Sequence, residues 1–370
     1  MHKYKLIYFS SKNYSSSTAD ALFVYKAIQA FNRILKEYFL FVLSENNEAG
    51  KFNGINTQEW GFKKAKFKTL FYFFKFPRLI KHLNRQTVVY SNEQPLIIVA
   101  LFWRLFFKFR VACEIHGFFN WQRDRFLLKI VRYCDKIIAT SENLRQLLVK
   151  LEPGLVNKIF VVRGGFDPEF FGEESDPQKI RSELNLPAGD FIIAYAGHLQ
   201  TRGEKGVSQL IEAAKLLNEK KLKLLLVGGR DSEIKEYQEI CSSDLCTFIP
   251  WLRDQKLAIK YLAASDLLVI PTSADSLYVS YSFPMKLYDY LALGKPILAA
   301  DIPIIREVLN NTNSLLFKRG DAQSMAGRIS FALSNEGLLQ SISRQAKIDS
   351  LAFTWQRRAG SILESIKIKQ

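Results

Sequence analysis

Residues 283–301, FPMKLYDYLALGKPILAAD, contain the signals that decide the fold of this 370-residue chain. Apolar side chains recur at helical spacing through residues 284–293, whereas residues 297–300 form a short, continuous apolar run of the kind found in buried strands. The stretch therefore predicts a helix that passes through a tight turn into a buried strand. Such a pair is half of a β-α-β unit of a parallel sheet.

The ends of this helix are also marked. Proline is favoured at the first helical position because the N–H that it lacks would have no partner there, so Pro284 is expected to begin the helix, with Ser282 or Phe283 as the cap. Gly294 and Pro296 are expected to end it. The free N–H groups and the positive dipole end of such a helix suit a phosphate, although an ordinary capped helix has the same signature.

The alternation of short apolar runs with amphipathic stretches continues on both sides of this unit. Strands are expected at residues 5–9, 38–43, 88–90, 111–115, 136–139, 158–162, 191–196, 224–227, 267–270 and 297–300. Helices are expected at residues 19–35, 126–133, 142–151, 207–217, 255–264 and 284–293. The pattern restarts after a polar, acidic segment, which predicts an α/β protein with two tandem Rossmann-like domains and a cleft between them. The expected parts are a domain at 1–170, a linker at 171–187 and a domain at 188–351.

Ligands of such sheets bind at the carboxyl ends of the strands. A loop of residues 197–206 follows the strand at 191–196, and its Arg202 and Lys205 could bind a diphosphate. His116 follows the strand at 111–115. Taken singly, basic residues at a loop tip are usually solvated and a lone histidine is usually structural.

The charge of the chain is unevenly distributed. There are 52 Lys and Arg against 36 Asp and Glu, a net charge of +16, and residues 51–110 hold 12 basic and 2 acidic residues together with 15 of the 49 aromatic residues. A basic, aromatic segment fits an anionic membrane face or a nucleic acid. Aromatic side chains that fill a core beneath solvated lysines would give the same composition.

Several classes of site and location are not indicated. The longest apolar run, residues 96–103, is too short to cross a bilayer, which takes about 20 residues. The apolar N-terminal stretch is too short for a signal peptide, so a cytoplasmic location is expected. The four cysteines lack the spacing of a zinc site and are expected to be reduced. The chain has no Asp-x-Asp pair, no Gly-x-Gly-x-x-Gly fingerprint and no Gly-x-Ser-x-Gly elbow.

Taken together, these motifs resemble one family, the glycosyltransferases of family 4 (glycosyl transferases group 1), which have the GT-B fold. Residues 195–199 (YAGHL) with Lys205-Gly206 resemble the family's Gly-Arg-Leu…Lys-Gly loop. Similar matches occur at 113–119 (CEIHGFF), 162–167 (VRGGFD), 225–229 (LLVGG), 264–271 (ASDLLVIP), 283–301 with Arg306-Glu307, and 353–355 (FTW). The resemblance covers nearly the whole chain, and it implies that a C-terminal helix at about 352–370 rejoins the first domain.

The resemblance implies roles for particular residues. Lys205 would hold the donor diphosphate, Asp289 would contact the nucleotide ribose, and His116 would lie near the transferred sugar; these three are the expected catalytic residues. The expected donor-binding residues are Gly197, His198, Arg202, Gly229, Trp251, Leu252, Tyr281, Ser282, Phe283, Met285 and Lys286. No metal and no cofactor are expected.

Three positions depart from the family pattern. Tyr281 stands where the family has the first Glu of its Glu, seven residues, Glu motif, Asp289 replaces the second Glu, and His198 replaces the loop arginine. A catalytically degenerate member of the fold, a sugar-nucleotide epimerase, and a basic nucleic-acid-binding protein therefore stay open as alternatives. Against the last, no nucleic-acid-binding signature accompanies the basic segment.

The expected function is that of a retaining, metal-independent glycosyltransferase of the hexosyltransferase type. Its expected partners are a UDP- or GDP-linked sugar donor and a glycan or lipid-linked acceptor of surface polysaccharide synthesis, with no nucleic acid. The basic aromatic segment, at residues 62–78 above all, is expected to dock on an anionic membrane surface, which makes the protein peripheral on the inner face of the cell membrane.

Overall fold

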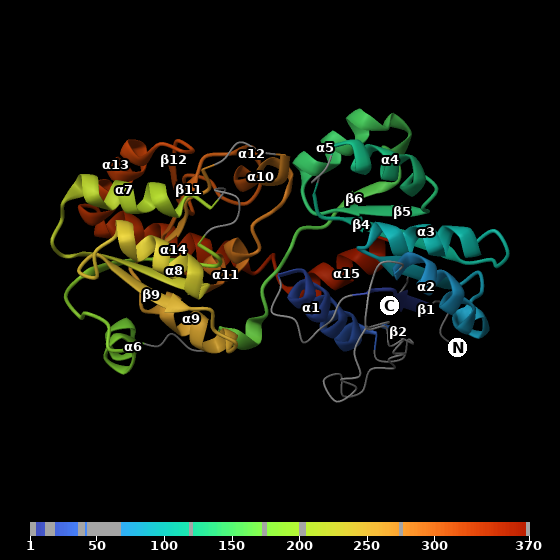
Figure 1. The fold of residues 1–370 in the computed structure, drawn as a ribbon, viewed down its shortest axis with the longest axis horizontal. Helices are drawn as coiled ribbons and strands as arrows, with labels where there is room; N and C mark the ends of the chain where they lie inside the picture. The colour runs from blue at the N-terminus through green and yellow to red at the C-terminus, as the bar shows by residue number, and fades with distance from the viewer. Residues whose placement is uncertain are drawn as a thin grey trace. The chain divides into compact units, whose positions relative to one another are not determined.

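A computed structural model describes residues 5–11, 19–35, 41–42, 68–117, 121–171, 176–199, 205–273 and 277–367. The chain forms two compact units, one of Met1–Gly164 with Trp355–Gln370 and one of Gly165–Thr354 (Figure 1). Each unit is an α/β domain with its own parallel sheet. The expected fold class, two Rossmann-like domains in tandem, is thereby confirmed.

The sheet of the first unit has the strand order β2-β1-β3-β4-β5-β6, and all of its pairs are parallel. Its strands are β1 (Lys5–Tyr8), β2 (Phe41–Val42), β3 (Thr87–Ser91), β4 (Arg110–Ile115), β5 (Lys136–Ala139) and β6 (Ile159–Val161). The central strands are buried on both faces, and β3 is buried at every residue. This is why they appear in the sequence as continuous apolar runs and not as alternating ones.

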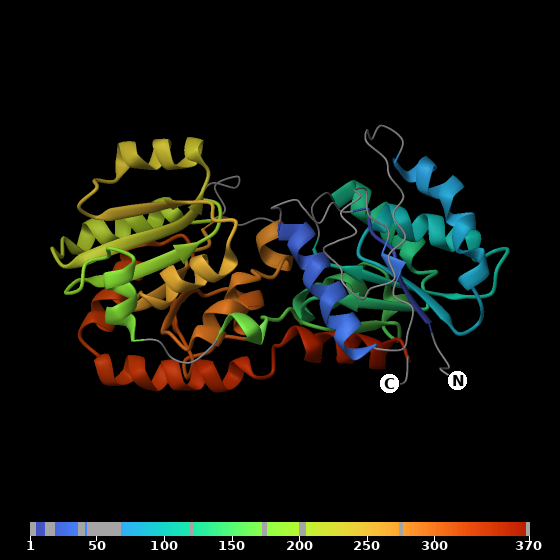
Figure 2. The same ribbon diagram turned by 90° about the horizontal axis from the view of Figure 1, so that it is seen from below.

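Helices cover this sheet (Figures 1 and 2). They are α1 (Ala19–Ile34), α2 (Lys68–Lys75), α3 (Gln94–Trp103), α4 (Trp121–Val131), α5 (Glu142–Leu151) and α15 (Trp355–Ser365), with 3₁₀ turns at Phe76–His82 and Pro153–Leu155. The C-terminal helix α15 packs beside α1, so the last part of the chain belongs to the first unit.

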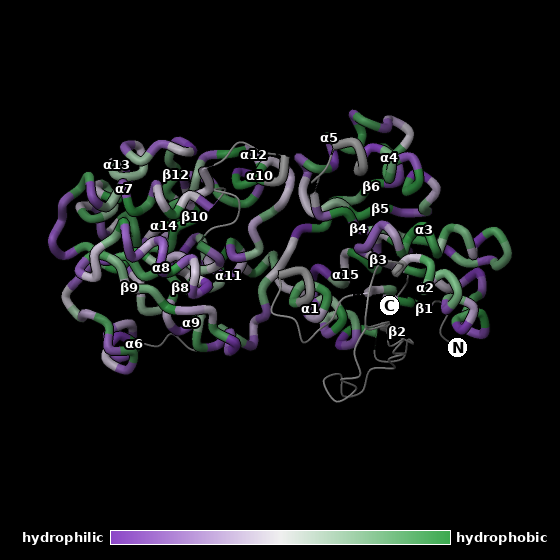
Figure 3. Tube along the Cα trace, viewed as in Figure 1, coloured by the Kyte–Doolittle hydropathy of each residue, from purple (hydrophilic) through white to green (hydrophobic). Residues whose placement is uncertain are grey.

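The sheet of the second unit has the order β12-β11-β10-β7-β8-β9 and is also parallel throughout. Its strands are β7 (Phe191–Ala196), β8 (Leu222–Gly229), β9 (Cys246–Pro250), β10 (Leu267–Ile270), β11 (Ile297–Ala300) and β12 (Leu315–Phe317). Figure 3 shows these strands as predominantly hydrophobic segments of the unit. Apolar side chains from the two sides of the sheet form two separate core clusters, one on each face.

The helices of the second unit follow its strands. They are α6 (Pro177–Glu183), α7 (Val207–Leu217), α8 (Asp231–Ile240), α9 (Gln255–Ala263), α10 (Leu277–Tyr281), α11 (Lys286–Leu293), α12 (Pro303–Arg306), α13 (Ala322–Leu333) and α14 (Glu336–Ser350), and a 3₁₀ turn lies at Pro168–Phe170.

The segment expected as a linker, residues 171–187, is part of the second unit, as far as the structure describes it. Its helix α6 is anchored by Arg181, which is 2% exposed. The Arg181 guanidinium donates to the Ala264 carbonyl at 2.8 Å and to Asp266 Oδ2 at 2.6 Å. An acidic, polar composition was therefore misleading here, because one buried arginine holds the segment against α9 and β10.

The helix at residues 284–293 begins two residues later than expected, at Lys286, with Met285 as its N-cap. The Leu287 N–H donates to the Pro284 carbonyl at 3.0 Å and the Tyr288 N–H to the Met285 carbonyl at 3.2 Å, so the first turn is a tighter one with i→i+3 hydrogen bonds. The helix ends at Leu293, and Gly294 has the left-handed conformation (φ 62°) that a C-terminal cap requires.

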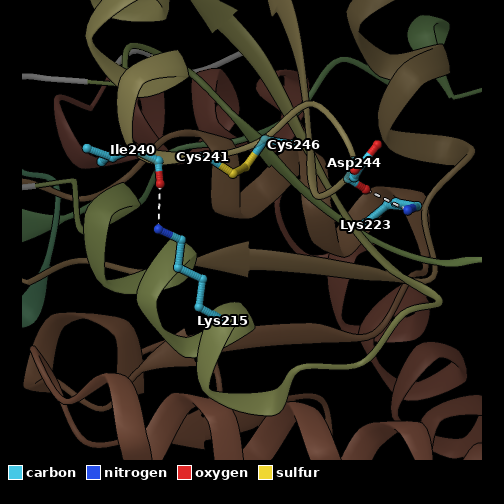
Figure 4. The surroundings of a disulfide bond; sticks show 6 residues. All are labelled: Lys215, Lys223, Ile240, Cys241, Asp244 and Cys246. Atoms are coloured by element: carbon cyan, nitrogen blue, oxygen red, sulfur yellow. Dashed lines mark hydrogen bonds between the residues drawn. A yellow bond between two sulfur atoms is a disulfide. The ribbon is translucent and has the colours of Figure 1, made fainter.

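The expectation that all four cysteines are reduced is wrong for one pair. Cys241, after α8, and Cys246, at the start of β9, form a disulfide across a short turn (Figure 4). On its two sides, Lys215 donates to the Ile240 carbonyl and Lys223 to the Asp244 carbonyl (Figure 4). Cys113 and Cys134 are buried and form no disulfide. The spacing of cysteines can indicate a zinc site. No comparable spacing rule predicts a single disulfide that closes a turn.

Candidate functional site

Candidate residues of the second unit gather where β7 and β8 end. Gly197, just after β7, has φ 128° and donates its N–H to the Val227 carbonyl at 2.8 Å. A Cβ at Gly228 would lie 3.3 Å from both the backbone N and the carbonyl O of Gly197. The two backbone segments approach this closely because neither glycine has a side chain.

Lys205 lies at the start of α7, and Gly206 fixes it there. Gly206 is the N-cap of α7 with φ 72°, and a Cβ at this position would lie only 1.9 Å from the carbonyl oxygen of Pro271. Pro271 directly follows β10, so this contact joins the start of α7 to the carboxyl end of the neighbouring strand. Arg202, the other cation expected in this loop, lies outside the described residues.

Lys286 reaches the same place from the first turn of α11. Its Nζ lies 3.6 Å from the centre of the Tyr195 ring and 3.1 Å from the position that a Cβ on Gly197 would take. Burial, and secondarily the charge of Lys205, lowers the pKa of Lys286 well below its usual value. Both lysines are therefore close enough to affect each other's charge.

The loop after β7 is held by two further side chains. The Tyr195 hydroxyl donates to the His198 carbonyl at 2.8 Å. Glu233 Oε2 accepts the backbone N–H of Leu199 at 3.2 Å and that of Arg230 at 3.0 Å, which ties the loop to the start of α8. Glu233 is thus already engaged with backbone donors.

His198 itself has an unsatisfied nitrogen. Its Nδ1 is buried and makes no hydrogen bond with any described residue, and Glu233 Oε2 is 3.9 Å away. Burial, followed by the charge of Arg230, lowers the pKa of His198 below its usual value. The imidazole is accordingly neutral at pH 7.

The other expected donor-binding residues lie around this edge of the unit. Ser282 Oγ is a second buried polar atom with no hydrogen-bond partner in the described part of the chain, and Phe283 stacks on Tyr288 with ring centres 5.2 Å apart. Trp251 is 44% exposed, and its backbone N–H donates to the carbonyl of Gly229 at 3.0 Å.

The remaining expected residues of this unit occupy the same helices and turns. Tyr281 ends α10, Met285 caps α11, and Asp289 lies in the first turn of α11. Met285 and Leu252 pack against the core cluster beneath this edge.

The first unit contains a buried polar cluster around Glu114 of β4, which is 1% exposed. Glu114 Oε1 accepts from His116 Nε2 at 2.9 Å, and the Glu114 carboxylate also accepts from the Tyr90 hydroxyl and forms an ion pair with Arg358 of α15. The ring of Phe23 packs edge-on against His116 with centres 4.3 Å apart. His116 is therefore held by a carboxylate and a ring, with 27% of its side chain exposed.

The charges of this cluster are strongly coupled. Burial alone would raise the pKa of Glu114, but Arg358, His116 and the Tyr90 hydroxyl outweigh it and lower this pKa to about 2. Burial, followed by the charge of Glu114, raises the pKa of Tyr90. Tyr90 therefore stays a hydrogen-bond donor, and Glu114 stays an anion, throughout the physiological pH range.

The structure thus brings together most of the sequence-predicted residues of the second unit and adds others that sequence reasoning missed. The missed residues are Tyr195, Arg230 and Glu233 in the second unit and Glu114, Tyr90 and Arg358 in the first. Glu114 had a signal, because residues two apart on a strand share a face and His116 is two residues on. No sequence signal pointed to Arg358, because it lies 244 residues from Glu114 in the sequence.

What this edge of the second unit can do chemically follows from its charges. Among the described residues, the basic side chains of Lys205, Lys286 and Arg230 lie near His198, and the Glu233 carboxylate is engaged by backbone N–H groups. Together with two unsatisfied buried polar atoms, this arrangement fits a compact polyanion such as a diphosphate. Within the described residues, no three His, Cys, Asp or Glu side chains are grouped as metal ligands would be.

Two parallel Rossmann-like sheets, with a cationic site at the carboxyl edge of the second, define a protein of the GT-B class. Two family models match the chain: "Glycosyl transferases group 1" at residues 176–349 and "Glycosyltransferase Family 4" at residues 40–170. The chain therefore belongs to the group 1, family 4 glycosyltransferases.

The individual relatives that match this chain share low sequence identity with it. The chain is 29% identical over 251 residues to the D-inositol 3-phosphate glycosyltransferase of Nocardia farcinica, a match that covers 64% of this chain and 53% of that protein. It thus spans about half the length of that curated relative. It is 24% identical over 305 residues to the N,N'-diacetylbacillosaminyl-diphospho-undecaprenol alpha-1,3-N-acetylgalactosaminyltransferase of Campylobacter jejuni, with 76% of each chain covered.

Among solved structures, HepE of Anabaena in complex with UDP is similar in fold. The TM-score is 0.77 at 18% identity, and the match covers 98% of this chain and 99% of that one.

Proposed function

We propose that this protein transfers a sugar from a UDP- or GDP-linked donor to a lipid-linked glycan acceptor in surface polysaccharide synthesis, with retention of anomeric configuration and without a metal. The observation that carries the proposal is the cationic site formed by Lys205, Lys286 and Arg230 at the carboxyl edge of the second sheet. Relatives that act in polysaccharide synthesis support the choice of acceptor, as does the diphospho-undecaprenol named for the Campylobacter enzyme.

The chemical task is to stabilise a leaving group. Expulsion of a nucleoside diphosphate builds negative charge on its terminal phosphate, and cations already in position stabilise that charge without reorganisation. Lys205 is suited to this because Gly206 holds it against the turn after β10. The adjoining polar atoms, Ser282 Oγ and His198 Nδ1, are buried without partners among the described residues, which supports their use as ligands for the donor.

In the first unit, His116 is proposed to contact the transferred sugar or the incoming acceptor. Its Nε2 is occupied by Glu114, which leaves Nδ1 as the ring nitrogen for a ligand. Asp289 of α11 is proposed to bind the donor ribose.

The proposal is tested with Lys205→Ala. Transfer and donor hydrolysis, measured over a panel of UDP- and GDP-sugars, should fall about 10²- to 10³-fold, the loss typical of a lost charge-stabilising donor. Lys215→Met, which removes a cation from the far end of α7, is the control and should leave turnover unchanged. Near-normal turnover of correctly folded Lys205→Ala would refute the proposal.

We further propose that the first unit docks on the cytoplasmic face of an anionic membrane. Only the part of the basic aromatic segment from Lys68 onward is described. Within the described residues, no helix is long and apolar enough to span a bilayer. Four large apolar side chains of α2 and of the turn after α3 are strongly exposed: Leu70 (53%), Phe74 (70%), Leu105 (77%) and Phe106 (65%).

This apolar surface is bordered by Lys75, Arg104 and Lys108. Basic residues next to anionic lipid contribute about 1 kcal/mol each, and exposed aromatic side chains suit the interface. Sedimentation with vesicles containing phosphatidylglycerol should show salt-sensitive binding that Phe74→Ser with Phe106→Ser abolishes. Binding that is absent at low salt, or unchanged in this double variant, would contradict docking.

A further inference from the structure

Lys286 has no anionic partner among the described residues. Its side chain is half-buried, and its Nζ lies over the Tyr195 ring, 3.6 Å from the ring centre. A ring face stabilises an ammonium by about 0.5–2 kcal/mol, much less than its loss of hydration costs. Burial lowers the pKa of such an ammonium, and a bound anion would favour its charged form.

The groups that face Lys286 do not neutralise it. Tyr195 of β7 and Tyr290 of α11 are both phenols whose pKa is raised by burial, so neither becomes an anion at neutral pH. Lys205, before α7, adds a second positive charge.

Across the loop after β7, Arg230 adds a third positive charge near His198, and the carboxylate of Glu233 is bound by two backbone N–H groups. On its own helix, Asp289 follows Lys286 by three residues. Among the described residues, the local charge balance is therefore positive.

His198 cannot supply the charge that the family's arginine would carry at its position. Its pKa lies below the usual 6.5, so the ring is neutral at pH 7. The Lys286 ammonium, however, lies against Gly197, the residue just before His198. The Lys286 side chain, which comes from α11, thus lies beside the loop position where the family has an arginine and this chain has His198.

We propose that Lys286 is the second diphosphate-binding cation of this enzyme, in place of the missing loop arginine, and that it takes up a proton as the diphosphate binds. The inference rests on the proposed donor site. A bound diphosphate supplies the anion that Lys286 lacks, so the protonated form is favoured in the complex. By linkage, binding of the nucleotide then weakens as the pH rises, by up to about tenfold per pH unit, where free Lys286 is neutral and bound Lys286 is charged.

The test is calorimetric titration of the full chain with UDP, and with GDP if UDP does not bind. Lys286→Met should raise the dissociation constant of the nucleoside diphosphate about 10- to 100-fold, the effect of one lost charge-assisted hydrogen bond. The dissociation constant of the matching nucleoside, which has no phosphate, should stay unchanged. Lys215→Met, which removes the same charge from the opposite end of α7, is the matched control and should bind like the unmodified protein.

Proton uptake is measured in the same experiment. Between about pH 7 and about pH 9.5 the terminal phosphate is already ionised, since its pKa is about 6. Heats measured in buffers of different ionisation enthalpy should show net proton uptake for the unmodified protein and less for Lys286→Met. Lys286→Arg, whose charge does not titrate in this range, should bind the diphosphate with a flatter pH profile.

The possible results separate the two proposals. If neither UDP nor GDP binds the unmodified protein at millimolar concentration, the donor-site proposal fails and the inference with it. If the nucleotide binds and Lys286→Met binds it equally well, the donor site stands and the role of Lys286 is refuted. Parallel pH profiles of the unmodified protein and Lys286→Met would overturn the proton uptake.

Discussion

Replacing Glu114 with glutamine should destabilise the first unit by about 3 kcal/mol near neutral pH. In the folded protein, burial alone would raise the pKa of Glu114, but Arg358, His116 and the Tyr90 hydroxyl together lower it from 4.5 to about 2. A difference of between two and three pH units corresponds to about 3 kcal/mol. Glutamine would also leave Arg358 buried without a counter-ion, a change that typically costs about 3–5 kcal/mol.

The sign of the pH dependence follows from the direction of the shift. Because the folded-state pKa of Glu114 is depressed, its contribution is fully present above pH 4.5 and is lost as the pH falls from 4.5 toward 2. The unmodified protein should therefore lose stability over this interval, and Glu114→Gln should lack that component. The two proteins should consequently differ most above pH 5.

Urea unfolding at several pH values, with hydrogen exchange of the β4 and α15 amides, measures this difference within the first unit. Glu364→Gln on the exposed side of α15 is the matched control and should change stability by less than about 0.5 kcal/mol. If Glu114→Gln unfolds at the same urea concentration as the unmodified protein at pH 7, the ion pair with Arg358 does not stabilise the fold.

Three further predictions concern the second unit. Gly206→Ala should lower thermal stability and weaken UDP binding measured by titration, because a Cβ would lie 1.9 Å from the Pro271 carbonyl at a φ of 72°; equal melting temperatures would contradict it. Arg181→Met should cost about 2–3 kcal/mol of unfolding free energy in urea, since it removes the charged hydrogen bonds of Arg181 to the Ala264 carbonyl and to Asp266; a loss under about 1 kcal/mol would show that α6 is not anchored this way. Reducing the Cys241–Cys246 disulfide, which closes a loop of sequence separation 5, should cost about 2 kcal/mol on chain-entropy grounds, with thiol counting by mass spectrometry as the check that the bond was present.

Much of the fold could be predicted from local pattern. The expected strands at 136–139, 191–196, 267–270 and 297–300 coincide with those of the structure, because a parallel strand covered on both faces has a continuous apolar sequence. The strands β9 and β12, the two edges of the second sheet, were not expected: β9 is mostly half-buried and interrupted by a threonine, and β12 has only three residues. The segment expected as a linker, residues 171–187, is grouped with the second unit, and its buried Arg181 looks like any surface arginine in the sequence.

The residues of the candidate site likewise fall into those that the sequence predicted and those that only the structure brings together. The glycines, Lys205 and His116 lie at strand ends, where sequence order alone predicts functional residues. Glu114 and Arg358 lie 244 residues apart, and only the packing of α15 within the first unit makes them partners. Likewise, nothing in the sequence around Lys286 shows that its ammonium lies over the Tyr195 ring 91 positions earlier.

The sequence by itself therefore determined the fold class, the family and the strand ends that carry the site, because these depend on periodicity and on motifs within a few residues. The tertiary structure alone decided which charges are buried and which are paired. Those properties depend on the dielectric surroundings and on neighbours brought together by long-range packing, and neither is encoded in local spacing.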